Sequence, residues 1–583
     1  ATPADYTRVT ESQLSSGRWW RFRIAETGVY KITYDELRRL GVTAPAALSV
    51  WGGEPHQLPY DNATPNVDDL QQIPVRWVTR DGIPRSGDYA LFFLEGPAWW
   101  EYNPAQAMYD YHEHDYERHA HYFFTTDRPA MDLPVVESPA PTRRQADYIG
   151  LWGTIGRKTN LRYSGREYFG DPFDFTTERT YSPSSLGRGV VGSPARCFVR
   201  LAASSKRTTR YDISVAGHPV TTLELAPSFL NDSELATVDE VRGAFDLPAE
   251  QVSLTIRFQR AGYSSSGWLS RLWINARQTF PERVSQLPFF VDREGTSATY
   301  TAFDFPSYAP EVELWNVTRL FHPWQYVSRE GATAQPGDQL VLFDRRAARS
   351  ITVEGEVANQ NLHGLEVPEL LIVTHERFLS QAEAIADIYR HSPLVLYKDI
   401  KVVTAEAVYN EFSSGNRDVS AIRNFARFLY WRDGGATGRF HHLLLVGKPY
   451  YELRERWDDY NLQSFNSVSA YYSFGSDDIF GFLDPEETPE RGALDIGVGL
   501  YAVKRGEEMD ILLRRERIYH TPAHWGTWLT RAVMLADDED ALSYMIGSDS
   551  LAVRIEKERK DIEVKRLYVD AFRQENLWHR SYY

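Results

Sequence analysis

The pattern of hydrophobic and polar residues changes character at about residue 369. Before that point, short runs alternate between apolar and polar positions, which is typical of β-strands with one buried face. After it, a near-continuous apolar run at 370–374 is followed by segments in which apolar residues recur every three or four positions. Such a run is typical of a buried parallel strand, and such spacing is typical of an amphipathic helix. The pattern predicts a β-rich first part and an α/β second part.

Residues 408–431 form the clearest unit of the second part. A polar, turn-rich loop is predicted at 410–417, and a helix is predicted from Asp418, whose carboxylate can accept from the free N–H groups of the first turn. One face of this helix carries Ile422, Phe425, Ala426 and Leu429. Strands are predicted on either side, at 400–403 and 442–446. This order of strand, loop, helix and strand is the repeating unit of an open α/β sheet.

Further elements extend this second part. Helices are predicted at 378–391, 507–519 and about 549–557, and strands at 468–474, 495–499, 531–536 and 564–569. In open sheets, ligands and catalytic groups gather at the carboxyl ends of the strands. That rule singles out Thr374, the loop after Val446, the pair Asp477 and Asp478, and the acidic run 537–540.

The first part is predicted to contain separate β modules. Alternating segments lie at 19–24, 29–32, 75–78, 89–94, 197–202, 211–215, 252–258, 271–276, 289–291, 298–303, 312–316 and 339–344. These predict a β-rich domain at 1–135, a linker at 136–165, and a β-sandwich-like region of one or two modules at 166–365. The α/β part is expected to divide into one subdomain at 366–525 and the start of a second at 526–583.

Composition and charge argue against some classes of function. The net charge of -16 works against nucleic-acid binding, which needs basic patches to contact phosphates. No apolar run approaches the roughly 18–20 residues of a membrane-spanning helix. The first residue is Ala1 and no leader follows it, so the numbering is expected to start after a removed signal peptide.

Two sets of residues invite a chemical interpretation. Cys197 is the only cysteine, which excludes an intrachain disulfide framework; in a strand it is interpreted as a small apolar core residue rather than as a nucleophile. Residues 109–121 hold two His-x-His pairs, His112 with His114 and His119 with His121. They could bind a metal ion if brought together, but a polar, aromatic strand and loop at a sheet edge is the favoured interpretation.

Several motifs, taken in order, resemble the gingipain family of cysteine peptidases, and within it the surface sortases of the bacterial type IX secretion system. The resemblance runs along nearly the whole chain and is carried by residues 27–37, 164–170, 200–204, 409–425, 476–481 and 495–499. The chain departs from the family at Lys448 and Leu500. The resemblance implies β-rich N-terminal modules followed by a caspase-like α/β domain of two subdomains.

The resemblance also implies a His–Cys dyad, with the histidine in a Gly-His-Gly turn. This sequence contains no Gly-His-Gly, and Cys197 lies in the wrong domain. The chain is therefore expected to be the N-terminal part of a peptidase, inactive alone. By the same resemblance, Asp537 or Asp538 would orient the catalytic imidazole, with a solvated acidic turn as the alternative. Calcium is a candidate ligand at Asp477, Asp478 and Asp484, with a turn capped by Asp477 as the favoured alternative.

As a complete protein, such an enzyme would cleave the C-terminal secretion signal of exported cargo and transfer the cargo to anionic lipopolysaccharide. The partners implied are the signal domains of the cargo, that lipopolysaccharide, and PorV-like and PorZ-like proteins of the outer-membrane attachment complex. The location implied is the surface of a Gram-negative bacterium, with peripheral attachment. The alternative is a non-catalytic scaffold that docks to outer-membrane secretion partners.

Overall fold

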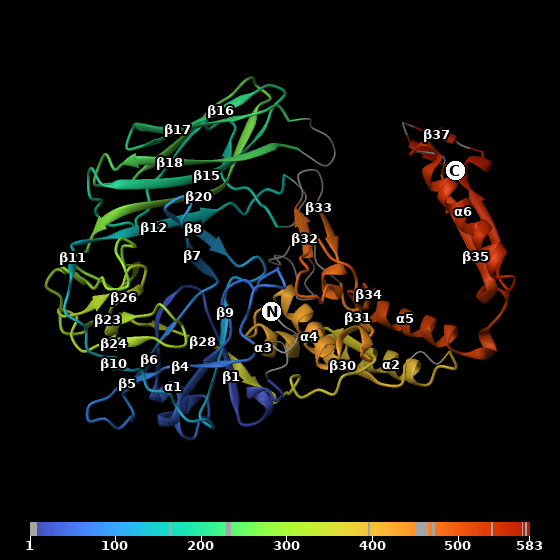
Figure 1. Ribbon diagram of the computed structural model, residues 1–583, viewed down its shortest axis with the longest axis horizontal. Coiled ribbons are helices and arrows are strands. Elements are labelled where there is room, and N and C mark those ends of the chain that lie inside the picture. The colour runs from blue at the N-terminus through green and yellow to red at the C-terminus, as the bar shows by residue number, and fades with distance from the viewer. Residues whose placement is uncertain are drawn as a thin grey trace. The chain divides into compact units, whose positions relative to one another are not determined.

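The computed structural model describes residues 9–161, 166–228, 235–394, 397–448, 465–468, 473–537, 540–573, 575–577 and 580–582 (Figure 1). The chain divides into two compact units. One comprises Ala1–Leu379 with Asp399–Lys504, and the other comprises Ser380–Lys398 with Arg505–Tyr583. None of the described helices combines the length and the apolar character that crossing a bilayer requires.

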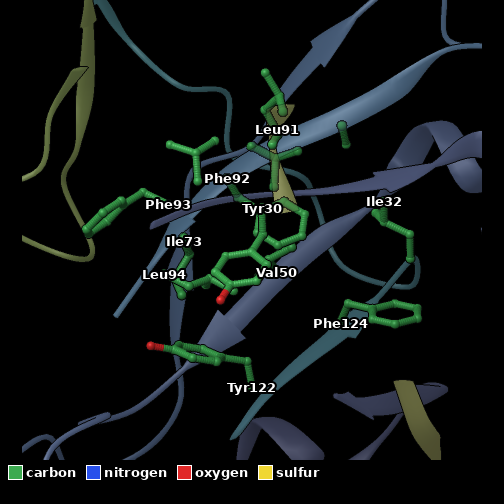
Figure 2. Packing of buried hydrophobic residues seen from close by; sticks show 14 of the residues in the cluster. Tyr30, Ile32, Val50, Ile73, Leu91, Phe92, Phe93, Leu94, Tyr122 and Phe124 are labelled. Atoms are coloured by element: carbon green, nitrogen blue, oxygen red, sulfur yellow. The ribbon is translucent and has the colours of Figure 1, made fainter. Parts of the chain in front are cut away.

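Two sheets build the first module. One has the order β28 (Thr352–Val357), β1 (Trp19–Ile24), β9 (Ala120–Thr125), β3 (Ser49–Gly52) and β4 (Gln71–Ile73). The other has the order β27 (Arg349–Ser350), β2 (Gly28–Thr33), β6 (Tyr89–Leu94) and β5 (Arg76–Val78). Both sheets contribute to one hydrophobic core, and Figure 2 shows side chains from β2, β3, β6 and β9 gathered there. The hairpin β7 (Ala98–Asn103) and β8 (Met108–Glu113) stands apart from the two sheets, and the short helix α1 (Tyr34–Arg39) follows β2.

The second module is a β-sandwich, as the alternating pattern predicts. One sheet contains β12 (Asp147–Ile155), β20 (Ser266–Thr279), β15 (Pro194–Ser204) and β18 (Thr237–Asp246), with β13 (Pro172–Phe173) paired to β20. The other contains β14 (Glu178–Tyr181), β19 (Leu254–Gln259), β16 (Thr209–Val215) and β17 (His218–Leu225). The described residues of 136–165 are not the linker that their composition predicts. They include β12, which pairs along its whole length with β20 and forms an edge of this sheet.

A third β region follows. Its main sheet has the order β10 (Val135–Val136), β24 (Trp324–Tyr326), β23 (Val312–Asn316), β26 (Gln339–Asp344) and β21 (Gln286–Phe290). A smaller one joins β11 (Arg143–Gln145), β22 (Thr301–Phe303) and β25 (Thr333–Ala334). Alternate residues of β26 enter two different cores: Leu340 and Leu342 enter one, and Val341 and Phe343 enter the core of the first module. Because both faces of β26 are covered, its sequence is a continuous apolar run.

The first unit also contains a parallel sheet with the order β30 (Ile400–Thr404), β29 (Leu370–Thr374), β31 (His442–Val446) and β34 (Gly497–Tyr501). One face packs against α3 (Ala405–Phe412) and α4 (Val419–Arg432). The predicted loop at 410–417 is wrong in its first part, because α3 continues to Phe412. The hairpin of β32 (Phe465–Val468) and β33 (Ser473–Ser476) precedes β34.

The second unit contains α2 (Leu379–Arg390, of which the first residue is assigned to the first unit), α5 (Gly506–Tyr519) and α6 (Ser543–Glu558). Its parallel strands β35 (Arg531–Ala536) and β36 (Glu563–Tyr568) pair with each other, and α6 packs on them. A short hairpin joins β37 (Glu575–Leu577) and β38 (Arg580–Tyr582). Val533, Leu535 and Leu567 are exposed on this small sheet.

Candidate functional site

Thr374 and the start of the loop after Val446 lie at carboxyl ends of the parallel sheet, as predicted. Asp477 and Asp478 do not, because they follow β33, which belongs to an antiparallel hairpin outside that sheet. Thr374 ends β29 and is fully buried, and its hydroxyl donates to the carbonyl oxygen of Val446 over 3.2 Å. The N–H of Gly447 donates to the carbonyl oxygen of Tyr501 at the end of β34. These contacts hold three strand ends together. Residues 449–464 of the loop after Val446 lie outside the described residues.

Asp537 directly follows β35, so a carboxylate does stand at the end of that strand. It is half-buried and makes no side-chain hydrogen bond to any described residue. Asp538 lies outside the part of the chain that the structure describes. The role of either carboxylate in orienting an imidazole stays a prediction.

Asp477, Asp478 and Asp484 lie on the segment that includes the short 3₁₀ helix Asp478–Gly481. Asp477 occupies the N-cap position of this helix, but its side chain makes no capping hydrogen bond. Burial and the nearby charge of Asp478 raise the pKa of Asp477. Among the described residues, no group of three or more His, Cys, Asp or Glu side chains is placed to hold a metal ion. The three carboxylates therefore do not form a preassembled calcium site.

Cys197 is a core residue of the β-sandwich, as its place in a strand predicts. Its side chain is fully buried in β15 among the apolar residues of both sheets. Burial raises the pKa of the Cys197 thiol to about 12. A thiol in this environment stays protonated at neutral pH and does not act as a nucleophile.

The histidines of residues 109–121 do not converge on one metal site. The ring of His112 stacks on Trp99 with 5.3 Å between ring centroids. His114 and His121 are instead buried against the start of α4 and the turn before it. The favoured interpretation, a polar and aromatic strand and loop, is thus closer to the structure than a metal site. It predicts that the segment lies at a sheet edge, whereas the structure places it in a junction between modules.

That junction is organised by Asp418, the N-cap of α4. One carboxylate oxygen accepts from the N–H of Ser420, and the other accepts from the N–H of Leu58 and from Gln57 Nε2, each within 2.9 Å. The ring Nδ1 of His114 accepts from two backbone N–H groups, so the proton is on Nε2, which faces the Asp418 carboxylate at 3.5 Å. Burial raises the pKa of Asp418 to about 7, and the donated backbone hydrogen bonds oppose that shift.

The turn before α4 contacts the same segment of the first module. The hydroxyl of Ser414 donates to the carbonyl oxygen of His121, and the N–H of His121 donates to Asn416 Oδ1. Arg417 donates to the buried carboxylate of Glu117 from both its backbone N–H and its Nε. The two tracts that stand out in the sequence, 109–121 and 408–431, are therefore two sides of one interface.

Two buried arginines of α4 could not be identified from the sequence. Arg423 donates to the carbonyl oxygens of Tyr60 and Pro59 over 2.6 and 2.7 Å. Arg427 donates to the carbonyl oxygen of Asn62. Helical periodicity assigns these arginines to a solvent-facing side, but a loop of the first module covers that side and eleven of the fourteen residues of α4 are buried.

The family comparison concerns the second part of the chain. Residues 363–583 match the model of Peptidase family C25. No curated protein matches this chain. This match covers the parallel sheet, α3, α4 and both segments of the second unit.

A solved structure is similar over most of the chain. Dimeric latent PorU from Porphyromonas gingivalis superposes with a TM-score of 0.77 over 90% of this chain, at 21% sequence identity. The likeness shows the fold, a β-rich N-terminal region followed by an α/β domain. The chain spans about half the length of that protein, 51% of it.

Carbohydrate-binding structures are similar only in part. The Carbohydrate-Binding Module CBM36 in complex with calcium and xylotriose covers 21% of this chain and 91% of its own, at 14% identity and a TM-score of 0.15. The sugar-binding EclA C-terminal domain covers 24% of this chain and 83% of its own, at 16% identity and a TM-score of 0.13. TM-scores of this size carry no information about the function of this chain.

Proposed function

We propose that this chain is the N-terminal part of a cysteine peptidase that works as a cell-surface sortase. The observation that supports the proposal is the PorU fold over 90% of the chain, together with the match of residues 363–583 to Peptidase family C25. In such an enzyme a thiolate attacks the carbonyl carbon at the cleavage site, and an imidazole protonates the leaving amine. An amine acceptor then displaces the thiolate from the acyl-enzyme.

The substrate in this proposal is a secreted cargo protein with a C-terminal type IX secretion signal, and the acceptor is an amine of anionic lipopolysaccharide. The protein would be attached to the outside of the outer membrane through PorV-like and PorZ-like partners. Asp537 would accept from the ring N–H of the catalytic imidazole, because it directly follows β35 and makes no side-chain hydrogen bond within the described part of the chain. Calcium at Asp477, Asp478 and Asp484 would require these side chains to rearrange.

The test is cleavage of a signal-bearing substrate by the native protein, with and without iodoacetamide. Cleavage is expected to stop on alkylation. The matched control is Cys197→Ala, in which both the activity and its sensitivity to iodoacetamide should persist, since Cys197 is buried in the β-sandwich. Cleavage that survives alkylation would remove the thiol mechanism, and loss of cleavage in a folded Cys197→Ala variant would assign the nucleophile to Cys197.

A non-catalytic scaffold is the second candidate. It is favoured by the state of Cys197, whose thiol is the only one in the sequence and is buried with a raised pKa. Intact-mass measurement of the native protein separates the two functions. A mass well above 67.0 kDa leaves room for a dyad outside this sequence, whereas a native protein of that mass alone supports the scaffold.

A further inference from the structure

A cavity of about 340 Å³ lies in the first unit, between the β7–β8 hairpin, the segment before Asn62 and the β-sandwich. Its lining comprises Gln57, Leu58, Pro59, Tyr60, Trp99, His112, Glu113, Asp115, Arg118, Ile155, Arg157, Arg166, Tyr168 and Arg271. A water molecule occupies about 30 Å³ of liquid, so the cavity has space on the order of ten waters. This volume is in the range of small-molecule sites.

The charge of the cavity is opposite to that of the chain. Four guanidinium groups line it against two carboxylates, whereas the whole chain has a net charge of -16. The lining imidazole, His112, is mostly buried, and burial together with the charge of Arg271 lowers its pKa. At neutral pH the ring is uncharged, so the excess of positive charge belongs to the arginines.

Both lining carboxylates already have partners. Glu113 accepts from the hydroxyl of Tyr111 and forms an ion pair with Arg157. Asp115 accepts from the hydroxyl of Tyr60 over 3.0 Å and forms an ion pair with Arg166 at 3.2 Å. Neither carboxylate forms an ion pair with the fourth cation of the lining.

That cation is Arg271 of β20. Its Nε is shielded from solvent and has no hydrogen-bond partner, and its guanidinium forms no ion pair with any described residue. The residue directly opposite on β15, Arg200, shows the contrast, because it is paired with both Glu167 and Glu240. A shielded N–H group without a partner is costly, and a bound anion that accepts from it would remove that cost.

We propose that this cavity binds a small organic anion, a phosphate or carboxylate group carried on a compact polar body, with Arg271 donating to the oxyanion. A guanidinium presents paired N–H donors that match the geometry of either oxyanion. The volume of the cavity is larger than a bare oxyanion needs, and its polar wall of hydroxyl, amide and guanidinium groups suits hydroxyl groups on the rest of the ligand.

Calorimetric titration of the full 583-residue chain tests the proposal. The probes are glucose 1-phosphate and glucuronate, with uncharged glucose as the reference, in a buffer without phosphate or carboxylate. At least one anionic probe should bind more tightly than glucose. Arg271→Gln should weaken that binding about tenfold or more, the loss expected for a charge-assisted hydrogen bond. The matched control is Arg207→Gln, which removes an exposed arginine outside the cavity and should leave binding unchanged.

The two anionic probes separate the two sources of negative charge: tighter glucose 1-phosphate assigns a phosphate ligand, and tighter glucuronate assigns a carboxylate. Arg271→Lys keeps the charge without the paired donors and should bind with intermediate affinity, so a folded variant is available if Arg271→Gln unfolds. Without ligand, Arg271→Gln should unfold at the same temperature as the native chain or higher, because it removes an unpaired cation. Failure of both anions to bind, equal binding of glucose, or binding unchanged in both Arg271 variants would overturn the proposal.

Discussion

The ring Nδ1 of His363 donates to Glu411 Oε2 over 2.7 Å, and both side chains are fully shielded from solvent. The second ring nitrogen of His363 faces Asp68 of the first module, and its ring stacks on Phe412 with 4.5 Å between centroids. Burial opposes the charge, but the hydrogen bonds to Asp68 and Glu411 raise the pKa of His363 to about 10. A buried imidazolium therefore joins α3 to the N-terminal β module.

Replacing His363 tests this ion pair. His363→Gln is expected to lower the free energy of unfolding by about 3 kcal/mol near pH 6, because it leaves the Glu411 carboxylate buried without a counter-charge. The folded pKa is raised above the unfolded value, so the stabilisation is complete below about pH 6.5 and is lost as the pH rises through 10. Denaturation measured from pH 6 to 10.5 should show that the difference in free energy of unfolding between the variant and the native chain becomes smaller as the pH rises.

The double variant His363→Gln with Glu411→Gln serves as the control for this pair, since it removes both charges. At pH 6 the double variant should be more stable than His363→Gln alone, because Glu411 is no longer a buried charge without a partner. A double variant that loses the sum of the two single losses would mean that the two groups do not interact.

Asp418 should also contribute less to stability as the pH rises, but over a lower pH range than His363. Its folded pKa of about 7 lies above the ordinary value of 3.8, so the contribution to stability is largest below about pH 4 and declines as the pH rises to 7. In Asp418→Asn this titration is absent. We therefore expect the difference in unfolding midpoint, variant minus native chain, to increase as the pH is raised from 4.5 to 7.

A suitable reference is Asp344→Asn, at the N-cap of an exposed 3₁₀ turn. The hydrogen bond and charge of Arg346 lower the pKa of Asp344, which keeps it ionised across this range. The difference between Asp344→Asn and the native chain should stay flat from pH 4.5 to 7. A flat difference for Asp418→Asn as well would show that Asp418 is ionised throughout.

Arg423 is expected to stabilise the junction through its carbonyl partners. Arg423→Met keeps much of the buried volume but leaves the carbonyl oxygens of Pro59 and Tyr60 without their donor, which should cost about 3 kcal/mol. The same substitution at the exposed Arg515 of α5 should change stability by less than about 0.5 kcal/mol. Chemical denaturation of both variants measures the difference, and equal losses would contradict a role for the buried donor.

The thiol of Cys197 should be unreactive in the folded chain. With a pKa of about 12 and full burial, it should not react with a disulfide reagent such as DTNB within an hour at pH 8. After denaturation in guanidinium chloride, one thiol per chain should react within minutes. Rapid reaction of the native chain would show that the β-sandwich opens at β15.

How much the sequence predicts can be judged from residues 408–431. Asp418 as the helix N-cap and the apolar face with Phe425 are correct, because a cap and a periodic face are local properties. The end of α3 at Phe412 was missed, since the polar residues near it were interpreted as a loop. Those polar groups are buried by contacts with residues 54–62 and 114–121, more than 290 positions away, and no local pattern reports such contacts.

The candidate site, too, could be predicted only in part from the sequence. The strand ends at Thr374 and Asp537 were predictable from the order of strands and helices, because an open sheet fixes which ends share an edge. The cavity at Arg271 was not, since its walls come from segments far apart in the sequence and only the folded chain shows which arginine lacks a carboxylate.

The pairing of β28 with β1 and of β27 with β2 sets a time order for folding. The N-terminal sheets are completed by residues 349–357, so β1 and β2 leave the ribosome long before their last partners exist. At a synthesis rate of 5–20 residues per second, roughly 15 to 70 s separate the two events. During that interval the edges of β1 and β2 are open to pairing with other chains. A chain of this topology therefore depends on being kept apart from its neighbours until synthesis has passed Val357.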